Sequence, residues 1–211
     1  MGYNLQKRKS KKVFPSKVLE KYHARLVTLK KDQILFQDGD TASDYFQVES
    51  GVVKMYIVND DGQEFIQGIF HAGESFGEPA LIARFPYPGS VMAIEPAKVW
   101  KLPGDYFLRM LQENFDLHMK MDEVLCQRLK YKSMVLSEIS SHEPEHRILS
   151  LLKYYKTKNH PSKETPGRVT IPYTRQQLAD MSGLRVETVI RTVKKMEKDK
   201  KLILEGHKIR F

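Results

Sequence analysis

The stretch from Thr174 to Lys198 places the strongest constraint on the fold, because it has the pattern of two helices joined by a tight turn. Thr174 lies three residues before Gln177, the spacing of a capping box that begins a first helix. Gly183 supplies a residue that tolerates the left-handed conformation at the end of that helix. Apolar residues then recur at helical spacing in a second helix: Val186, Val189, Ile190, Val193 and Met196. The sequence therefore predicts a helix-turn-helix.

The polar face of the second predicted helix is suited to DNA. Glu187 and Arg191 share a face near the helix N-terminus, the end that reaches base edges in this motif. Arginine bonds bidentately to guanine and glutamate accepts from cytosine, so the pair suits a half-site with G·C pairs. An ordinary surface helix with an ion pair is the alternative. Further side chains on this helix suit phosphates: Thr188, Thr192, Lys194, Lys195 and Lys198.

The segment TRQQLADMSGLRVETVIRTVKKMEKDKKLIL, which begins at Thr174, resembles the DNA-binding motif of the CRP/FNR transcription regulators. The resemblance is specific at Thr174-Arg175, Leu178, Gly183, Glu187-Thr188-Val189 and Arg191. It implies base contacts by Glu187 and Arg191, with Val186 where the FNR branch has valine and the CRP branch arginine. Arg185 departs from the family, which has Ser or Thr at that capping position, and adds a candidate contact. The predicted phosphate contacts are Thr174, Arg175, Arg185, Thr188, Lys194 and Lys195.

The net charge of +9 is unevenly distributed along the 211 residues. Residues 1–20 carry a net +5 and residues 138–211 a net +7, whereas residues 21–137 carry a net −3. The positive charge therefore lies on the N-terminal segment and on the part that holds the helix-turn-helix, where a polyanion such as double-stranded DNA is expected to bind. Residues 1–20 are interpreted as a basic tail that either contacts DNA or only solubilises the chain.

Cys126 is the single cysteine, so neither an intrachain disulfide nor a cysteine-ligated cluster is expected within one chain. No apolar run approaches about 18 residues, and the basic N-terminus is not followed by an apolar core. These features predict a cytoplasmic protein with neither a membrane span nor a secretory signal.

Strand patterns dominate residues 21–104. Short β-rich runs recur at about 8- to 12-residue spacing, at 33–36, 45–50, 52–58, 64–70, 90–94 and 98–102. Turn signals rich in Gly, Asp and Pro separate them, which predicts an antiparallel β-barrel or jelly roll. The expected fold class is α+β: this barrel, a dimerisation helix over residues 105–137, and a winged helix-turn-helix over residues 138–211.

The barrel region resembles the cyclic nucleotide-binding domain of the same family, above all in the cassette from Gly73 to Leu81. The resemblance implies that amides at a short helix start face the cyclic phosphate, a physically sound anion site, and that the glutamate takes the ribose hydroxyl. Relatives that bind cyclic nucleotides follow that glutamate with Arg-Ser or Arg-Thr, whereas this chain has Tyr87-Pro88. Arg84 is expected on the short helix. The candidate effector pocket comprises Gly77, Glu78, Tyr87 and Ser90.

Loss of the phosphate-binding arginine removes a charge-assisted contact. The expectation is a pocket that is empty, filled by side chains, or used by an unidentified small-molecule effector. A cyclic nucleotide-responsive regulator is one alternative, and a small-ligand sensor that acts without DNA is another. The N-terminal cysteines of the FNR iron-sulfur cluster are missing, and His71 and His118 are too isolated to indicate haem, so no cofactor is predicted.

An H-E-x-x-H string from His142 to His146 fits a zinc protease signature. Pro144 opposes that reading, because the residue before a proline avoids the helical conformation that the two histidines require. The string instead predicts the start of a helix, with Ser140 or Ser141 and Glu143 near its cap. Neither a catalytic nor a metal site is predicted, and an enzyme is not expected.

The helical pattern over residues 105–137 has two apolar stripes. One comprises Leu117, Met121, Val124, Tyr131 and Val135, and the adjoining one His118, Leu125, Leu129 and Leu136. A helix with two apolar stripes must bury both, and the same helix of a second chain is the economical partner for one of them. The family resemblance also implies a homodimer that reads a palindromic operator, and contact with RNA polymerase in relatives that activate.

The chain is predicted to end in a wing. Residues 168–172 form a short strand, and a β-hairpin about Glu205-Gly206 follows the second helix of the motif. Basic side chains on and before this hairpin either touch the DNA backbone or are simply solvated: Lys200, Lys201, His207, Lys208 and Arg210.

Overall fold

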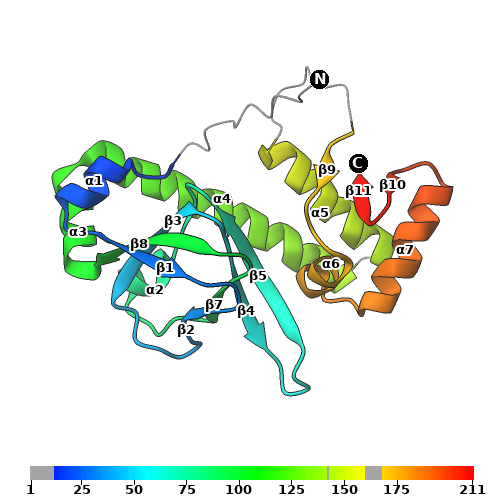
Figure 1. The fold of residues 1–211 in the computed structure, drawn as a ribbon, viewed down its shortest axis with the longest axis horizontal. Coiled ribbons are helices and arrows are strands. Elements are labelled where there is room, and N and C mark those ends of the chain that lie inside the picture. Colours follow the sequence, from blue (N-terminus) through cyan, green and yellow to red (C-terminus); the bar gives the residue numbers. More distant parts are fainter. Residues whose placement is uncertain (1–11, 142, 160–167) are drawn as a thin grey trace. The chain divides into compact units, whose positions relative to one another are not determined.

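The computed structural model describes residues 12–141, 143–159 and 168–211 (Figure 1). Contacts among these residues define two compact units. One comprises residues 12–57 and 67–127, and the other residues 58–66 and the described residues from 128 onward. The elements are α1 (Ser16–Lys21), β1 (Arg25–Leu29), β2 (Ile34–Phe36), β3 (Asp44–Ser50), β4 (Val52–Val58), β5 (Glu64–His71), β6 (Ser75–Phe76), α2 (Glu78–Ala83), β7 (Ser90–Ala93), β8 (Ala97–Pro103), α3 (Gly104–Glu113), α4 (Phe115–Ser141), α5 (Pro144–Asn159), β9 (Thr170–Ile171), α6 (Arg175–Ser182), α7 (Val186–Lys198), β10 (Ile203–Glu205) and β11 (Lys208–Arg210).

Two four-stranded antiparallel sheets form the barrel, in the orders β1-β8-β3-β6 and β2-β7-β4-β5. Alternate residues of both sheets face a common apolar core, as the period of a strand requires. That core includes Phe36, Phe46, Val48, Val53, Phe76, Tyr87, Val91, Ala93 and Val99. The predicted antiparallel β-barrel or jelly roll is confirmed, and the structure adds the short strands β1 and β6 to the predicted set.

A second apolar cluster lies on the other face of the first sheet, where β3 and β8 contribute Tyr45, Trp100 and Leu102. α1, α3 and the beginning of α4 cover this face, and Figure 1 shows α1 beside α3. Phe14 and Leu19 are fully buried there. The prediction that residues 1–20 form a basic tail is therefore wrong for Val13 onward, because apolar residues that follow the lysines fold onto the sheet.

The buried side chain of Gln47 fixes the backbone of this N-terminal segment. Phe14 N–H donates to Gln47 Oε1, and Gln47 Nε2 donates to the Phe14 carbonyl, each over 2.9 Å. Tyr45 O–H donates to the same Oε1 over 2.9 Å. Gln47 is 0% exposed, so its amide satisfies a backbone donor and acceptor that water does not reach.

Glu49, two residues along β3, holds the side chains of the same segment. Its carboxylate accepts from Lys12 Nζ, from Trp100 Nε1 and from Ser16 Oγ. Partial burial raises the pKa of Glu49, but the hydrogen bonds from Lys12, Trp100 and Ser16 outweigh it and hold the pKa below its ordinary value.

The single dimerisation helix predicted over residues 105–137 is two helices, α3 and α4, separated at Asn114. Asn114 has an extended backbone, with φ −137° and ψ 92°. Its Nδ2 donates to the Met110 carbonyl and to Tyr22 Oη, each over 2.9 Å. An asparagine side chain that bonds to the backbone in this way competes with helical hydrogen bonding, which explains the interruption.

The C-terminal unit contains the end of α4, the helices α5, α6 and α7, and a three-stranded sheet in the order β10-β11-β9. Its core comprises Ile148, Leu152, Val169, Ile171, Leu178, Ala179, Val189, Val193, Met196, Leu202 and Ile209. Pro144 is the first residue of α5, as predicted, but Ser140 and Ser141 belong to the end of α4 instead of the α5 cap. Within the described ranges, none of the helices has the length and apolar character to span a membrane.

Candidate nucleic-acid interface

The predicted capping box at the start of α6 is present. Thr174 Oγ1 accepts from Gln177 N–H over 3.1 Å, and Thr174 N–H donates to Gln177 Oε1 over 2.9 Å. Gly183 ends the helix with φ +64°, in the left-handed region predicted for it. α6 therefore begins and ends where the sequence predicts, and this fixes the start of α7 three residues after Gly183.

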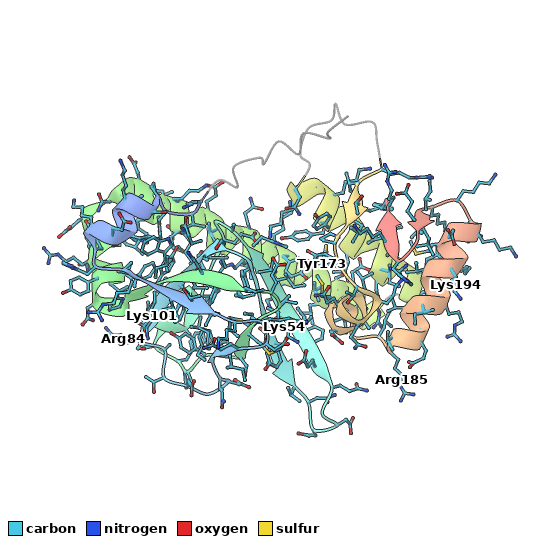
Figure 2. The ribbon with its side chains drawn as sticks, in the orientation of Figure 1. Lys54, Arg84, Lys101, Tyr173, Arg185 and Lys194 are labelled. Carbon is cyan, nitrogen blue, oxygen red and sulfur yellow. The ribbon has the colours of Figure 1, made fainter. Side chains whose placement is uncertain are left out.

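α7 divides cleanly into a buried face and an exposed face. Val189, Val193 and Met196 are each 0% exposed and pack in the core of the C-terminal unit. The exposed face carries Glu187, Ile190, Arg191, Lys194, Lys195 and Lys198, with Arg185 exposed just before it. Figure 2 shows Arg185 and Lys194 directed outward from α7. This face unites the predicted base contacts Glu187 and Arg191 at the N-terminal end of the helix.

Two residues of α7 lie on faces other than those predicted. Ile190 was assigned to the apolar face, yet its side chain is 40% exposed. Thr192 was considered suited to phosphate, yet it is 8% exposed and lies beside the core. A helix advances about 100° per residue, which places Ile190 at the border of the polar face and turns Thr192 inward. Residue type alone had suggested a buried isoleucine and an exposed threonine.

The remaining predicted contacts differ in accessibility. Val186 and Thr188 are half-buried, and Val186 packs against the core. Thr174 is exposed, but its hydroxyl serves as the helix cap. Arg175 is half-buried and its Nη1 donates to the His207 carbonyl in the wing over 3.4 Å; burial lowers the pKa of its guanidinium.

The predicted wing is present as β10 and β11. Gly206 turns the hairpin with φ +59°, and Arg210 Nη1 donates to Glu205 Oε1 over 2.7 Å across it. Glu197 of α7 anchors the hairpin, since its Oε1 accepts from Leu204 N–H over 3.1 Å. The wing is thus held to the recognition helix as well as to β9.

Arg147 of α5 bonds to the ends of two other helices, a contact that sequence reasoning missed. Its Nη2 donates to the Ile139 carbonyl near the end of α4 over 2.9 Å, and its Nη1 lies 3.5 Å from the Ser182 carbonyl at the end of α6. Helix C-termini leave carbonyls without intrahelical partners and carry partial negative charge. One cation therefore stabilises the ends of both helices.

The candidate effector pocket of the barrel is occupied by one of its own residues. Tyr87 is 3% exposed, and its ring stacks on Phe36 with centroids 3.9 Å apart. Its hydroxyl donates to the Asp44 carbonyl over 2.9 Å and accepts from Asp44 N–H over 3.2 Å. A Cβ added at Gly77, which begins α2 with φ +90°, would lie 3.4 Å from the Tyr87 ring. Tyr87 is therefore a core residue that closes the space beside Gly77.

The other pocket candidates are also engaged in the fold. Glu78 is fully buried at the start of α2, and Ser90 Oγ accepts from Asp38 N–H over 3.0 Å. Arg84, expected on α2, is instead the exposed residue that follows it, with φ +59°, and Figure 2 shows it at the surface of the barrel.

The H-E-x-x-H string lies only partly within the described residues. His142 lies outside them, whereas His146 is in the first turn of α5 with its Nδ1 2.5 Å from Glu138 Oε2. Over residues 12–141, 143–159 and 168–211, no group of three or more His, Cys, Asp or Glu side chains is placed to hold a metal ion.

An exposed, largely basic recognition helix, a wing and an antiparallel β-barrel define a class of protein: a regulator that binds DNA through a winged helix-turn-helix. Residues 26–114 match the family model of the cyclic nucleotide-binding domain, and residues 146–211 match that of the Crp-like helix-turn-helix domain. The chain belongs to the CRP/FNR family of transcription regulators.

Its relatives include FNR-type regulators. The "Transcriptional activator protein FnrA" of Stutzerimonas stutzeri is 25% identical over 183 residues, which cover 87% of this chain and 75% of that protein. The "Fumarate and nitrate reduction regulatory protein" of Escherichia coli (strain K12) is 24% identical over 178 residues, 84% of this chain and 71% of that protein. The family is one of transcription regulators.

Solved structures share the fold. The c-di-GMP responsive global regulator CLP of Xanthomonas campestris has a TM-score of 0.75 at 20% identity and covers 93% of this chain and 99% of its own. FixK2 from Bradyrhizobium japonicum has a TM-score of 0.74 at 19% identity, with 89% of this chain and 92% of that chain covered. At these identities the likeness establishes the architecture alone.

Proposed function

We propose that this regulator acts as a homodimer that reads a palindromic operator, with Glu187 and Arg191 of each protomer contacting base edges. The observation that carries the proposal is the position of both side chains, exposed and one turn apart at the N-terminal end of α7. That end of a recognition helix enters the major groove in helix-turn-helix proteins. Arg191 suits guanine and Glu187 suits cytosine.

Neighbouring residues complete this surface. Ile190 is an exposed apolar side chain between the two base-reading residues, and an apolar contact of this kind suits a thymine methyl group. Val186 is half-buried at the first position of α7, and its exposed part belongs to the proposed base-reading surface. Phosphate contacts are assigned to Thr174, Arg175, Arg185, Thr188, Lys194 and Lys195, of which Lys195 contributes least because it also pairs with Glu145. Because such contacts release counterions, binding falls steeply as salt rises.

Replacing Arg191 and replacing Lys194 are expected to have different effects. Arg191→Ala removes a bidentate base contact and should cost about 1–3 kcal/mol on the selected operator with little change on random DNA. Lys194→Ala should weaken binding to all duplexes about equally and reduce the slope of log affinity against log salt by about 1. Fluorescence anisotropy on both duplexes over a salt series measures these quantities. Equal losses on operator and random DNA for Arg191→Ala would contradict its base-reading role.

The apolar surface of α4 supports the homodimer. Phe115, Leu129 and Leu136 are 73%, 68% and 70% exposed, whereas Met121, on the adjoining stripe of the helix, is buried against the barrel. Burying a leucine contributes about 1.5–3 kcal/mol, so an exposed row of such residues favours association. An isologous contact between two copies of α4 matches the two-fold symmetry of a palindromic site.

Leu136→Glu is expected to weaken the dimer by about 100-fold or more, because a two-fold interface receives the buried charge twice. Sedimentation velocity at micromolar concentration should show a shift from dimer to monomer, together with loss of tight operator binding. Ile82→Glu on α2, where an isoleucine 41% exposed is replaced, is the matched control and should remain dimeric. A Leu136→Glu protein that stays dimeric would place the interface elsewhere.

The burial of Tyr87 supports a barrel that does not bind cyclic nucleotide in the usual way. Tyr87 stands at the position where the family resemblance implies a phosphate-binding arginine. Its ring occupies the space beside Gly77. An unidentified small-molecule effector remains a candidate partner. The name of one relative, a transcriptional activator, supports RNA polymerase as a further partner at promoters.

The test of the proposed function is selection of random duplexes by the purified full-length protein, with and without cyclic AMP and cyclic GMP. A palindrome enriched equally under all conditions would support both the regulator and the nucleotide-independent barrel. Enrichment only with nucleotide would keep the regulator and overturn the proposal for the barrel. A protein that selects no sequence under any condition would contradict operator reading by the chain alone and favour the sensor that acts without DNA.

A further inference from the structure

Glu145, in the first turn of α5, is paired with two lysines beside the recognition helix. Its Oε2 lies 3.2 Å from Lys195 Nζ of α7, and its Oε1 accepts a hydrogen bond from Lys201 Nζ, between α7 and β10. One carboxylate therefore contacts cations from two different segments of the winged helix. The three residues line a shallow groove with Glu143, His146 and Thr192.

The three charges remain accessible to a polyanion. The side chains of Lys195 and Lys201 are 67% and 46% exposed, while that of Glu145 is 21% exposed. Hydrogen bonds from Lys201 and Lys195 hold the pKa of Glu145 below its ordinary value, so the carboxylate is ionised at neutral pH. A phosphate that approaches these lysines from solvent meets a negative charge already placed between them.

Lys195 belongs to the DNA-reading side of α7. It lies four residues after Arg191, which itself lies four residues after Glu187, so the three side chains follow one another along adjoining turns. Thr192 of α7 and Glu145 of α5 line the same groove as Lys195. The pair with Glu145 is thus at the margin of the surface that the proposed function assigns to DNA.

We propose that Glu145 is a specificity-determining residue, an internal anion that occupies Lys195 and Lys201 and so limits attraction to DNA of any sequence. The inference rests on the proposed function, because it assumes that α7 faces DNA. A DNA phosphate can contact Lys195 or Lys201 only while that lysine is also paired with the carboxylate of Glu145. The negative charge of the carboxylate also repels the phosphate. The pairing therefore reduces the electrostatic component of binding.

Suppressing phosphate contacts favours the operator over other sequences. Such contacts carry no sequence information and supply essentially all of non-specific binding. On the operator, Glu187 and Arg191 fix the register, and freed lysines must use whichever phosphates that register presents. On random DNA the protein can slide to the register that uses them best. Removing the carboxylate should therefore strengthen random binding more than operator binding.

The experiment compares full-length wild type with Glu145→Gln, which keeps the shape of the side chain and removes its charge. Affinity for a random duplex at about 50 mM salt should rise about three- to tenfold, and the slope of log affinity against log salt should steepen by about 1–2 as one or two more phosphates are contacted. The ratio of operator to random affinity should fall. Unchanged or weaker random binding would overturn the proposal.

Glu205→Gln is the matched control, because it removes the same charge from the same unit but frees Arg210 of the wing instead. If it raises random affinity as much as Glu145→Gln does, net charge alone explains the effect and the proposal fails. Lys195→Gln supplies a second measurement that does not depend on the variant being fully stable. It should weaken random binding less than twofold in wild type but about threefold in the Glu145→Gln protein; equal losses in both backgrounds would overturn the proposal.

Failure of the proposed function is distinguishable from failure of this inference. A wild-type protein that selects an operator through Arg191, yet whose random affinity is unchanged by Glu145→Gln, refutes the inference alone. A wild-type protein that binds no duplex at all refutes both.

Discussion

Tyr87→Ala is expected to lower the free energy of unfolding of the barrel by about 3–5 kcal/mol, the cost of truncating a buried aromatic side chain. Tyr87 is 3% exposed and stacks on Phe36, so its removal leaves a cavity between the sheets. It also leaves both the N–H and the carbonyl of Asp44 without the hydroxyl that they share. Chemical denaturation in urea, followed by circular dichroism, measures the loss.

Tyr87→Phe separates the ring from the hydroxyl. Phenylalanine preserves the stacking and removes only the two hydrogen bonds to Asp44, so the loss should be about 1–3 kcal/mol. The difference between the two variants then gives the contribution of the ring. A Tyr87→Ala protein as stable as wild type would show that the ring fills no essential part of the core and would reopen the space beside Gly77 to a ligand.

Gln47→Leu is expected to cost about 2–6 kcal/mol, because it leaves the N–H and the carbonyl of Phe14 buried without partners, at about 1–3 kcal/mol for each group. Leucine has a similar size, so little of the loss comes from packing. The N-terminal segment should separate from the sheet, since Gln47 supplies both bonds to its backbone at Phe14. The second apolar cluster would then lose Phe14 and Leu19.

Trp100, the single tryptophan, reports this change directly. Its indole Nε1 donates to Glu49 over 2.6 Å, and Glu49 is held by Lys12 and Ser16 of the same N-terminal segment. Tryptophan emission should shift to longer wavelength in Gln47→Leu as the segment leaves. Gln37→Leu, at an exposed position after β2, is the control and should leave both stability and emission unchanged. Unaltered emission in Gln47→Leu would contradict the role of the amide.

The helix-turn-helix could be predicted from sequence because its signals are local. The capping box needs only Thr174 and Gln177, the turn needs only Gly183, and helical periodicity identifies the buried positions. The barrel followed from alternating strands and their turns in the same way. The strand β6 was missed, since its two residues are too few to show a period.

Tertiary structure decided the features that were predicted wrongly. The lysines before Val13 suggested a solvated tail, and the pairing of Phe14 with Gln47, 33 residues away, left no local signal. Asn114 lies within a continuous helical pattern, and its side chain interrupts the helix by bonding to the Met110 carbonyl and to Tyr22, 92 residues distant. Ile190 was placed in the core by its residue type, and its exposure follows from the orientation of α7 on the rest of its unit.

The candidate effector site was likewise predicted only in part from the sequence. Alignment by resemblance located Tyr87 at the position of a phosphate-binding arginine, which identified the loss of a charge. The sequence could not reveal that the ring turns inward and bonds to Asp44, because that depends on the spacing between β3 and the loop before β7. Glu145 likewise drew attention only as part of H-E-x-x-H, although Lys195 and Lys201 are its partners in the fold.

The two bonds of Arg147 affect how the C-terminal unit tolerates sequence divergence. Both acceptors are main-chain carbonyls, at Ile139 and Ser182, so they persist whatever side chains occupy those positions. The ends of α4 and α6 are thus free to change in sequence while a single guanidinium preserves their placement on α5. Chimaeras that exchange the DNA-reading part between family members should keep this arginine and the last turn of α4 together on one side of the junction.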